Sequence, residues 1–158
     1  MVTEIEEIKT KIAGLKEVFE SLEKVFTVTL GQAFTAEGKL YPKNIEYYNI
    51  KPTKSDFSHW KSLCGEGKKI IAKILDLNEQ RKFLWESDIE ALSKLGHTFD
   101  KIPEMIVWVK SCFLDDGSPN MQYIEGASSE IIANFNISKK IIEKGKEAMG
   151  ELHRILEN

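Results

Sequence analysis

The apolar residues near the start of the chain recur every three or four positions without a miss. They are Ile5, Ile8, Ile12, Leu15, Phe19, Leu22 and Phe26. This spacing puts all of these side chains on one face of an α-helix. Glu7 precedes Lys11 by four residues, the order that stabilises a solvated helix face. The pattern predicts a helix to about Leu30, roughly 40 Å long at about 1.5 Å per residue.

The end of the chain carries a longer stripe. Ser118 as N-cap and Pro119 in the first turn predict where a helix begins. Apolar and small residues then stay in phase, at Ile124, Ala127, Ile131, Phe135, Ser138, Ile142, Gly145, Met149, Leu152 and Leu156. We expect one helix rather than two, with residues 134–138 as the alternative point of division. The small residues on the stripe predict that a neighbouring backbone approaches closely.

Glycines interrupt the helical pattern in the middle of the chain. Ser55 is expected to cap a helix that Gly65 and Gly67 kink or split, because each glycine costs about 1 kcal/mol inside a helix. A further helix, closed or bent at Gly96, would follow before one that begins near Pro103.

Capping residues predict the intervening helix starts. Asn78 is expected to cap a short segment that ends at Trp85. Ser87 and Glu90 form the S-x-x-E pattern of a capping box, which predicts the start of the next helix.

A connection of about twenty residues separates the first helix from the second. Such a length is unusual inside a compact domain, so the segment either packs on its own aromatic side chains or binds something. Alternation around Ile45 and Ile50 permits a short strand. The connection concentrates three of the four tyrosines, Tyr41, Tyr47 and Tyr48.

These elements predict an all-α, up-and-down helical bundle of four to six helices with long N- and C-terminal helices. The end helices would be antiparallel, with the tyrosine-rich connection over one end. A chain of 158 residues that is 42% hydrophobic suits a single domain, residues 1–158. The apolar stripes also fit the seam of a homodimer through the end helices. Phe19 and Phe26 are bulky for a two-stranded seam, which favours the bundle.

Charge and composition exclude several partners. The 22 Lys and Arg residues nearly balance 25 Asp and Glu residues, and only Arg81 and Arg154 are arginines. Nucleic-acid binding, which relies on concentrated cations and on bidentate arginine, is therefore not expected. The longest apolar run, residues 105–109, is too short for a membrane span, so no membrane is expected as a partner.

The expected location is cytoplasmic. The first twelve residues are acidic and amphipathic, unlike a secretion signal. Cys64 and Cys112 lie far apart, and we interpret them as reduced, buried or inert thiols.

Two His–Asp pairs suggest a metal site. Asp56 lies three residues before His59, and His97 lies three residues before Asp100. Brought together, they would form the two-His, two-carboxylate set that divalent metals use in helical bundles, with hydrolysis as one outcome. The competing interpretation is that all four are capping and surface residues, and no cofactor is then expected.

The favoured function is a non-enzymatic protein-interaction module, a small regulator, adaptor, inhibitor or immunity-type protein. No convergent set of acid, base and nucleophile can be assembled from the sequence. Another protein would bind a helical face or Tyr41, Tyr47 and Tyr48, because exposed tyrosine makes good contacts at low entropic cost. The competing interpretation is that these tyrosines only seal one end of the bundle. A metal or small-ligand binding bundle is the alternative function. The tryptophans, by contrast, are expected in the core: Trp60, Trp85 and Trp108.

Overall fold

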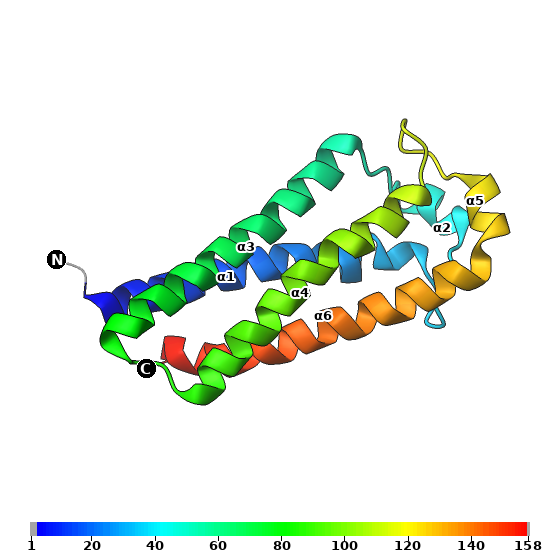
Figure 1. Ribbon diagram of the computed structural model, residues 1–158. Helices are drawn as coiled ribbons and strands as arrows, with labels where there is room; N and C mark the ends of the chain where they lie inside the picture. Colours follow the sequence, from blue (N-terminus) through cyan, green and yellow to red (C-terminus); the bar gives the residue numbers. More distant parts are fainter. Residues whose placement is uncertain (1–2, 158) are drawn as a thin grey trace.

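Helices make up most of the computed structural model, which describes residues 3–157 (Figure 1). A π-helical turn, η1 (Val25–Thr29), and a 3-10 turn, η2 (Gly31–Ala33), follow the first helix. The six α-helices are α1 (Glu4–Lys24), α2 (Pro42–Tyr47), α3 (Lys54–Arg81), α4 (Glu86–Ser111), α5 (Met121–Gly126) and α6 (Ser128–Glu157).

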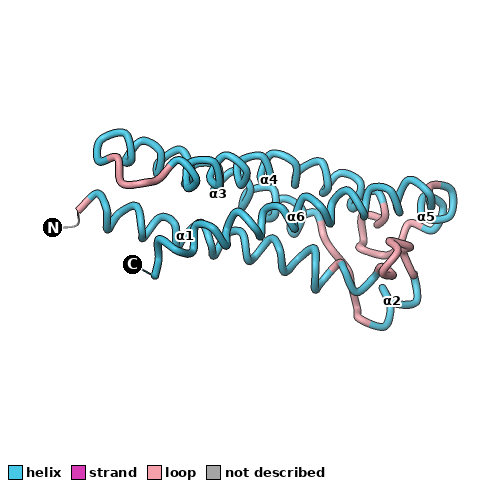
Figure 2. The backbone as a smooth tube through the Cα atoms, turned by 90° about the horizontal axis from the view of Figure 1, so that it is seen from below, coloured by secondary structure: helices cyan, strands magenta, loops and turns pink. Residues whose placement is uncertain are grey.

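The four long helices form an antiparallel bundle. α1 and α4 each pack against both α3 and α6. Figures 1 and 2 show that α1 and α4 run in one direction, α3 and α6 in the other, and that both ends of the chain lie at the same end of the bundle. The short helices α2 and α5 lie at the opposite end. The predicted all-α, up-and-down bundle with long, antiparallel terminal helices is confirmed.

The apolar stripes of the end helices face the interior of the chain. On α1, Ile8, Ile12 and Leu15 have no exposed surface, and on α6 Leu152 likewise has none. They belong to one continuous hydrophobic cluster with side chains of all the long helices. The faces that would form a dimer seam are thus buried within the chain.

The helix α3 passes through Gly65 and Gly67 without a break, so the predicted kink or split is wrong. Gly67 instead lies against the ring of Phe99, and a Cβ at this position would lie 2.7 Å from two ring carbons. Gly145 on α6 accommodates Phe19 in the same way, again with ring carbon 2.7 Å from a Cβ. The small residues therefore admit aromatic rings from neighbouring helices, rather than a neighbouring backbone as predicted.

The boundaries of α3 and α4 also differ from the predictions. Gly96 and Pro103 lie inside α4, which continues through both, because its apolar face remains buried on either side of them. Asn78 closes α3 instead of opening a segment, since its side-chain oxygen accepts the N–H of Leu84 at 2.8 Å. The start of α3 is capped by Thr53, not by Ser55.

Asp88, not Glu90, caps the start of α4. The backbone N–H of Trp85 donates to Oδ2 of Asp88 at 2.8 Å. The predicted S-x-x-E box is off by two residues, because Ser87 is already inside the helix.

The C-terminal segment is two helices rather than one. The division falls at Ala127, and residues 134–138 are helical. Asn120, and not Ser118 as predicted, caps α5, because its side chain accepts the N–H of Tyr123 at 3.3 Å. No strand occurs in residues 3–157, and the expected strand around Ile45 is helix α2 instead.

Candidate functional site

The tyrosine-rich connection folds over one end of the bundle on buried aliphatic side chains. Leu40, Ile45 and Ile50 are each at most 5% exposed. The side chain of Asn44 donates to the backbone oxygen of Gln32 at 3.2 Å, which ties α2 to the turn after α1. The short helix α2 is therefore held in place by the buried aliphatic side chains and by the hydrogen bond of Asn44.

The three tyrosines point outward from this support. Tyr47 is 80% exposed, Tyr48 47% and Tyr41 44%. The rings of Tyr47 and Tyr48 pack edge to face, with centroids 4.9 Å apart. The buried aliphatic side chains beneath cover this end of the bundle, and Tyr47 is the most exposed of the three tyrosines.

Tyr41 lies apart from the other two. It lines a shallow cavity with Met121 and Ile124 of α5, and the ammonium of Lys39 lies 5.6 Å from its ring centroid. The structure thus joins Tyr47 to Tyr48 and places Tyr41 beside α5. We call Tyr47 and Tyr48 the tyrosine pair.

The segment around the tyrosine pair is rich in lysine, with four lysines and one glutamate in residues 39–54. Lys54 forms an ion pair with Asp115 at 3.8 Å. The pKa of Asp116 lies below its usual range, chiefly because the Ser118 hydroxyl donates to it and to a smaller extent because Lys51 is near. Lys43 is exposed and has no ion pair within the described chain, so this end keeps free positive charge.

The four predicted metal ligands are not brought together. Asp56 accepts the Thr53 N–H at 2.8 Å as part of a capping box. Asp100 instead forms an ion pair at 2.6 Å with a lysine of α3, Lys68.

The two histidines, both exposed, lie far apart along the bundle. Gly67 and Phe99 mark where α3 and α4 meet, and these helices are antiparallel. His59 and His97 therefore lie about 15 Å apart along the axis at about 1.5 Å per residue. No three His, Cys, Asp or Glu residues between positions 3 and 157 could hold a metal ion together. The metal hypothesis stays a prediction without geometric support.

Both cysteines are free and buried. Burial raises the pKa of Cys64 and of Cys112 to about 12. A thiol at that pKa is almost fully protonated near neutral pH and is a poor nucleophile.

Trp85 was expected in the core, and the structure shows this expectation to be wrong. It lies in the turn between α3 and α4 and is 63% exposed. The guanidinium of Arg154 stacks over its indole, 4.0 Å from the ring centroid. Nη2 of Arg154 also lies 2.7 Å from both carboxylate oxygens of Asp88, whose side chain is 3% exposed. Trp60, by contrast, is buried as expected.

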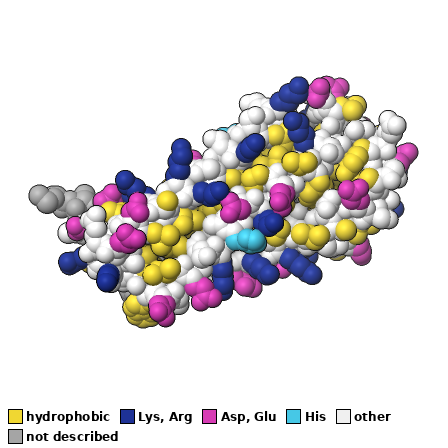
Figure 3. Space-filling view, in the orientation of Figure 1, with side chains coloured by type: hydrophobic (Ala, Val, Ile, Leu, Met, Phe, Trp, Pro, Cys, Tyr) yellow, Lys and Arg dark blue, Asp and Glu magenta, His cyan; other side chains and the backbone are white. Residues whose placement is uncertain are grey.

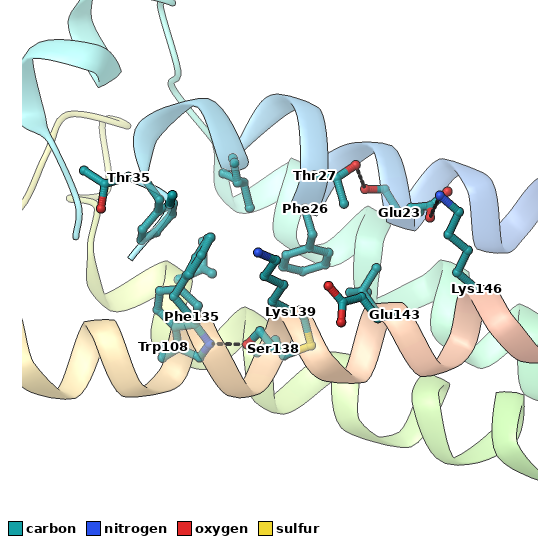
Figure 4. Close-up of a pocket in the computed structure, with 17 residues that line it drawn as sticks. Glu23, Phe26, Thr27, Thr35, Trp108, Phe135, Ser138, Lys139, Glu143 and Lys146 are labelled. Carbon is teal, nitrogen blue, oxygen red and sulfur yellow. Dashed lines mark hydrogen bonds and ion pairs between the residues drawn. The ribbon is translucent and has the colours of Figure 1, made fainter. Parts of the chain in front are cut away.

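Sequence reasoning missed a cavity of about 410 Å³ between η1, α4 and α6 (Figure 4). The only sequence signal is the β-branched run after α1, where the helix widens into the π-helical turn η1. π-Helical turns are rare and often occur at functional sites. The apolar lining consists of Phe26, Leu30, Phe34, Ala36, Met105, Trp108, Val109, Phe135 and Ile142.

Aromatic contacts hold one wall of this cavity. Phe34 stacks on Phe135 with ring centroids 4.6 Å apart and meets Trp108 edge to face at 5.7 Å. The indole N–H of Trp108 donates to the hydroxyl of Ser138 at 3.1 Å, so the only polar atom of this ring is satisfied. The wall is therefore apolar and fixed in position.

Four charged side chains surround the mouth of the cavity. Glu23 and Lys146 form an ion pair at 4.0 Å. Lys139 and Glu143 are exposed and have no ion pair among the residues that the structure describes. In Figure 4 the ammonium of Lys139 reaches over the cavity beside Phe26.

Figure 3 shows side chains of both charges interspersed over one face of the molecule, with apolar patches between them. Within residues 3–157, no helix has the length and apolar character needed to cross a membrane. Comparison with known proteins finds no matching family model, no matching curated protein and no matching solved structure.

Proposed function

We propose that this chain is a non-enzymatic protein-interaction module, a small regulator, adaptor, inhibitor or immunity-type protein, that binds another protein through the tyrosine pair. The observation that carries the proposal is the 80% exposure of Tyr47 on a helix braced against the bundle. The cytoplasmic location expected from the sequence belongs to the same proposal.

Two physical arguments support a binding role for the pair. Tyrosine has only two side-chain torsions, so fixing its ring at an interface costs little entropy. The edge-to-face contact of Tyr47 with Tyr48 already restricts both rings before any partner arrives. The entropic cost of ordering these two side chains when a partner binds is therefore smaller.

The partner surface should combine an apolar pocket with acidic groups at its rim. The pocket would take the ring of Tyr47, and the acidic rim would face the exposed ammonium of Lys43. Charge complementarity of this kind mainly speeds association, so binding should weaken moderately as salt rises.

The test is partner capture from the native cell extract with Tyr47→Ala/Tyr48→Ala beside the unchanged protein. We expect the double variant to retain at most about a tenth of the captured partner, because each central tyrosine contributes about 1–2 kcal/mol at an interface. The matched control is Trp85→Ala, which removes an exposed aromatic from the opposite end and should leave capture unchanged.

Capture that survives in the tyrosine variant and disappears in Trp85→Ala would overturn the proposal. Circular dichroism of both variants checks that the bundle remains folded. Because the tyrosine rings are exposed, the tyrosine variant should lower the melting temperature by no more than about 3 °C, whereas Trp85→Ala also loses the contact with Arg154 and should lower it further while the bundle stays folded.

A further inference from the structure

The cavity between η1, α4 and α6 has the size of a ligand site. Its volume is about 410 Å³, and small-molecule sites usually measure about 300–1,000 Å³. Neither tyrosine of the pair lines it, although Leu30 lines both this cavity and a smaller one beside Tyr48. A ligand here would not contact Tyr47 or Tyr48 directly.

The walls of the cavity favour a ligand with an apolar body. Nine apolar side chains line the cavity, and three of them, Phe34, Trp108 and Phe135, are held together by ring contacts. The polar atoms in the wall already have partners: Ser138 accepts from Trp108, and the hydroxyl of Thr27 donates to the backbone oxygen of Glu23 at 2.8 Å. The third hydroxyl in the lining, that of Thr35, accepts the N–H of Lys39 at 3.0 Å, so each hydroxyl side chain of the wall is hydrogen-bonded.

The charged side chains at the mouth of the cavity determine which head group a ligand can carry. Lys146 is paired with Glu23 at 4.0 Å, and Lys139 is the cation at the mouth without an ion pair in the described chain. Figure 4 shows the ammonium of Lys139 over the opening, between the aromatic side chains. Glu143, one turn further along α6, also lines the mouth, and its carboxylate would repel an anion bound there.

We propose that this cavity binds a small amphipathic monocarboxylate, with its apolar chain among Phe26, Phe34 and Phe135 and its carboxylate on Lys139. An aliphatic or aryl chain would pack against the apolar walls, and one carboxylate would pair with the ammonium of Lys139. The π-helical turn widens α1 at the residues that form the roof of this site.

Isothermal titration with sodium decanoate and with 1-decanol tests the proposal on the intact protein. We expect one decanoate per chain, bound about three- to tenfold more tightly than decanol, since a partly exposed charge pair adds a modest amount. Lys139→Met should abolish this preference while leaving decanol affinity within about twofold. Glu143→Gln should leave decanoate binding equal or tighter, because it removes a repelling charge.

A cavity-filling variant tests the location. Ala36 is exposed and lines the cavity, so Ala36→Trp should reduce binding of both probes at least about tenfold by occupying the space. Ala133→Trp is the matched control, because Ala133 is exposed on α6 and does not line the cavity.

Three results would overturn the proposal. They are the absence of saturable binding, equal loss of decanoate and decanol affinity in Lys139→Met, and unchanged binding in Ala36→Trp. If Ala36→Trp does not fold by circular dichroism, the Lys139→Met comparison decides alone. Loss of the tyrosine pair should change none of these affinities, so this test and that of partner capture fail or succeed separately.

Discussion

At the scale of single residues, glycines set how closely the helices approach. Gly67 gives the ring of Phe99 its place between α3 and α4, and Gly145 does the same for Phe19 between α1 and α6. Both rings are at most 1% exposed, so they are among the most deeply buried side chains. The same residue type at Gly65 faces open space and has no such role.

Gly67→Ala should destabilise the protein by about 1–2 kcal/mol, because the new methyl group overlaps the Phe99 ring. The matched substitution Gly65→Ala, with nothing within 4 Å of its Cβ, should stabilise by about 0.5–1 kcal/mol through helix propensity. Urea denaturation of the two variants measures both changes. Equal effects of the same sign would contradict the packing assigned to Gly67.

The buried thiols should resist modification in the folded protein. With the pKa of Cys64 and Cys112 raised to about 12, only about one thiol in ten thousand is ionised at pH 8. Labelling by a disulfide reagent should be at least about a hundredfold slower than in urea. Fast labelling of either thiol without denaturant would show that burial is not maintained.

The same shift has a consequence for stability. Unfolded thiols ionise near their ordinary pKa of 9.0, and the folded ones near about 12. The raised pKa contributes stability that is fully present below pH 9 and is lost as pH rises from 9 towards 12. Cys64→Ala/Cys112→Ala should show a weaker fall in stability over this interval, measured by thermal unfolding.

At the scale of elements, one ion pair ties the start of α4 to the end of α6. Asp88 caps α4 through the Trp85 N–H and binds Arg154 of α6 through both carboxylate oxygens. Asp88 is 2% exposed, so loss of its partners would leave a buried charge. The exposed Glu90, which the sequence pattern favoured as the cap, makes only a pair with Lys94 at 3.9 Å.

Asp88→Ala should therefore destabilise the protein by about 2–3 kcal/mol, through loss of the cap and of the ion pair. Glu90→Ala, two residues away, should change stability by less than about 0.5 kcal/mol. Guanidinium denaturation compares the two. A larger effect at Glu90 would restore the capping box that the sequence suggested.

The helices themselves were predictable, and their boundaries much less so. Unbroken apolar spacing identified α1 and the C-terminal helical segment, although not its division into α5 and α6, because burying a stripe outweighs any single poor helix former. The same effect carries α4 through Pro103 and α3 through Gly67, where local propensity predicted breaks. Each glycine inside a helix costs about 1 kcal/mol of stability. Tertiary packing along the 28 residues of α3 contributes more than that.

The candidate sites were predictable only in part. Tyrosines in a connection indicated the tyrosine pair, but no pattern could show that Tyr41 lies beside α5. Trp85 was misplaced because it lies in the turn between α3 and α4, where its ring packs under Arg154, distant in sequence, and not in the core. The cavity depends on three helices and a π-helical turn meeting in space, and such a meeting leaves no local signal beyond the β-branched run.

At the scale of the whole molecule, the bundle buries the apolar stripes of its own helices. Ile12, Leu22 and Leu152 are fully buried within one chain. A homodimer through the end helices would need those faces a second time. The large apolar side chains that stay exposed include Tyr47 and Trp85 at the two ends of the bundle and Val107 and Ile137 on its long helices.

We therefore expect a monomer of 18.0 kDa. Light scattering coupled to size exclusion should give this mass throughout a dilution series. A mass near twice that value at the high end of the series would show that another surface mediates self-association.

The most direct test of the proposed function places a photo-crosslinking side chain at position 47. Irradiation in the native extract should give one dominant crosslinked product for Tyr47→benzoylphenylalanine. The same side chain at Lys73, exposed on α3 between the two ends of the bundle, should give none. The same product from both positions, or a product from position 73 alone, would contradict recognition through the tyrosine pair.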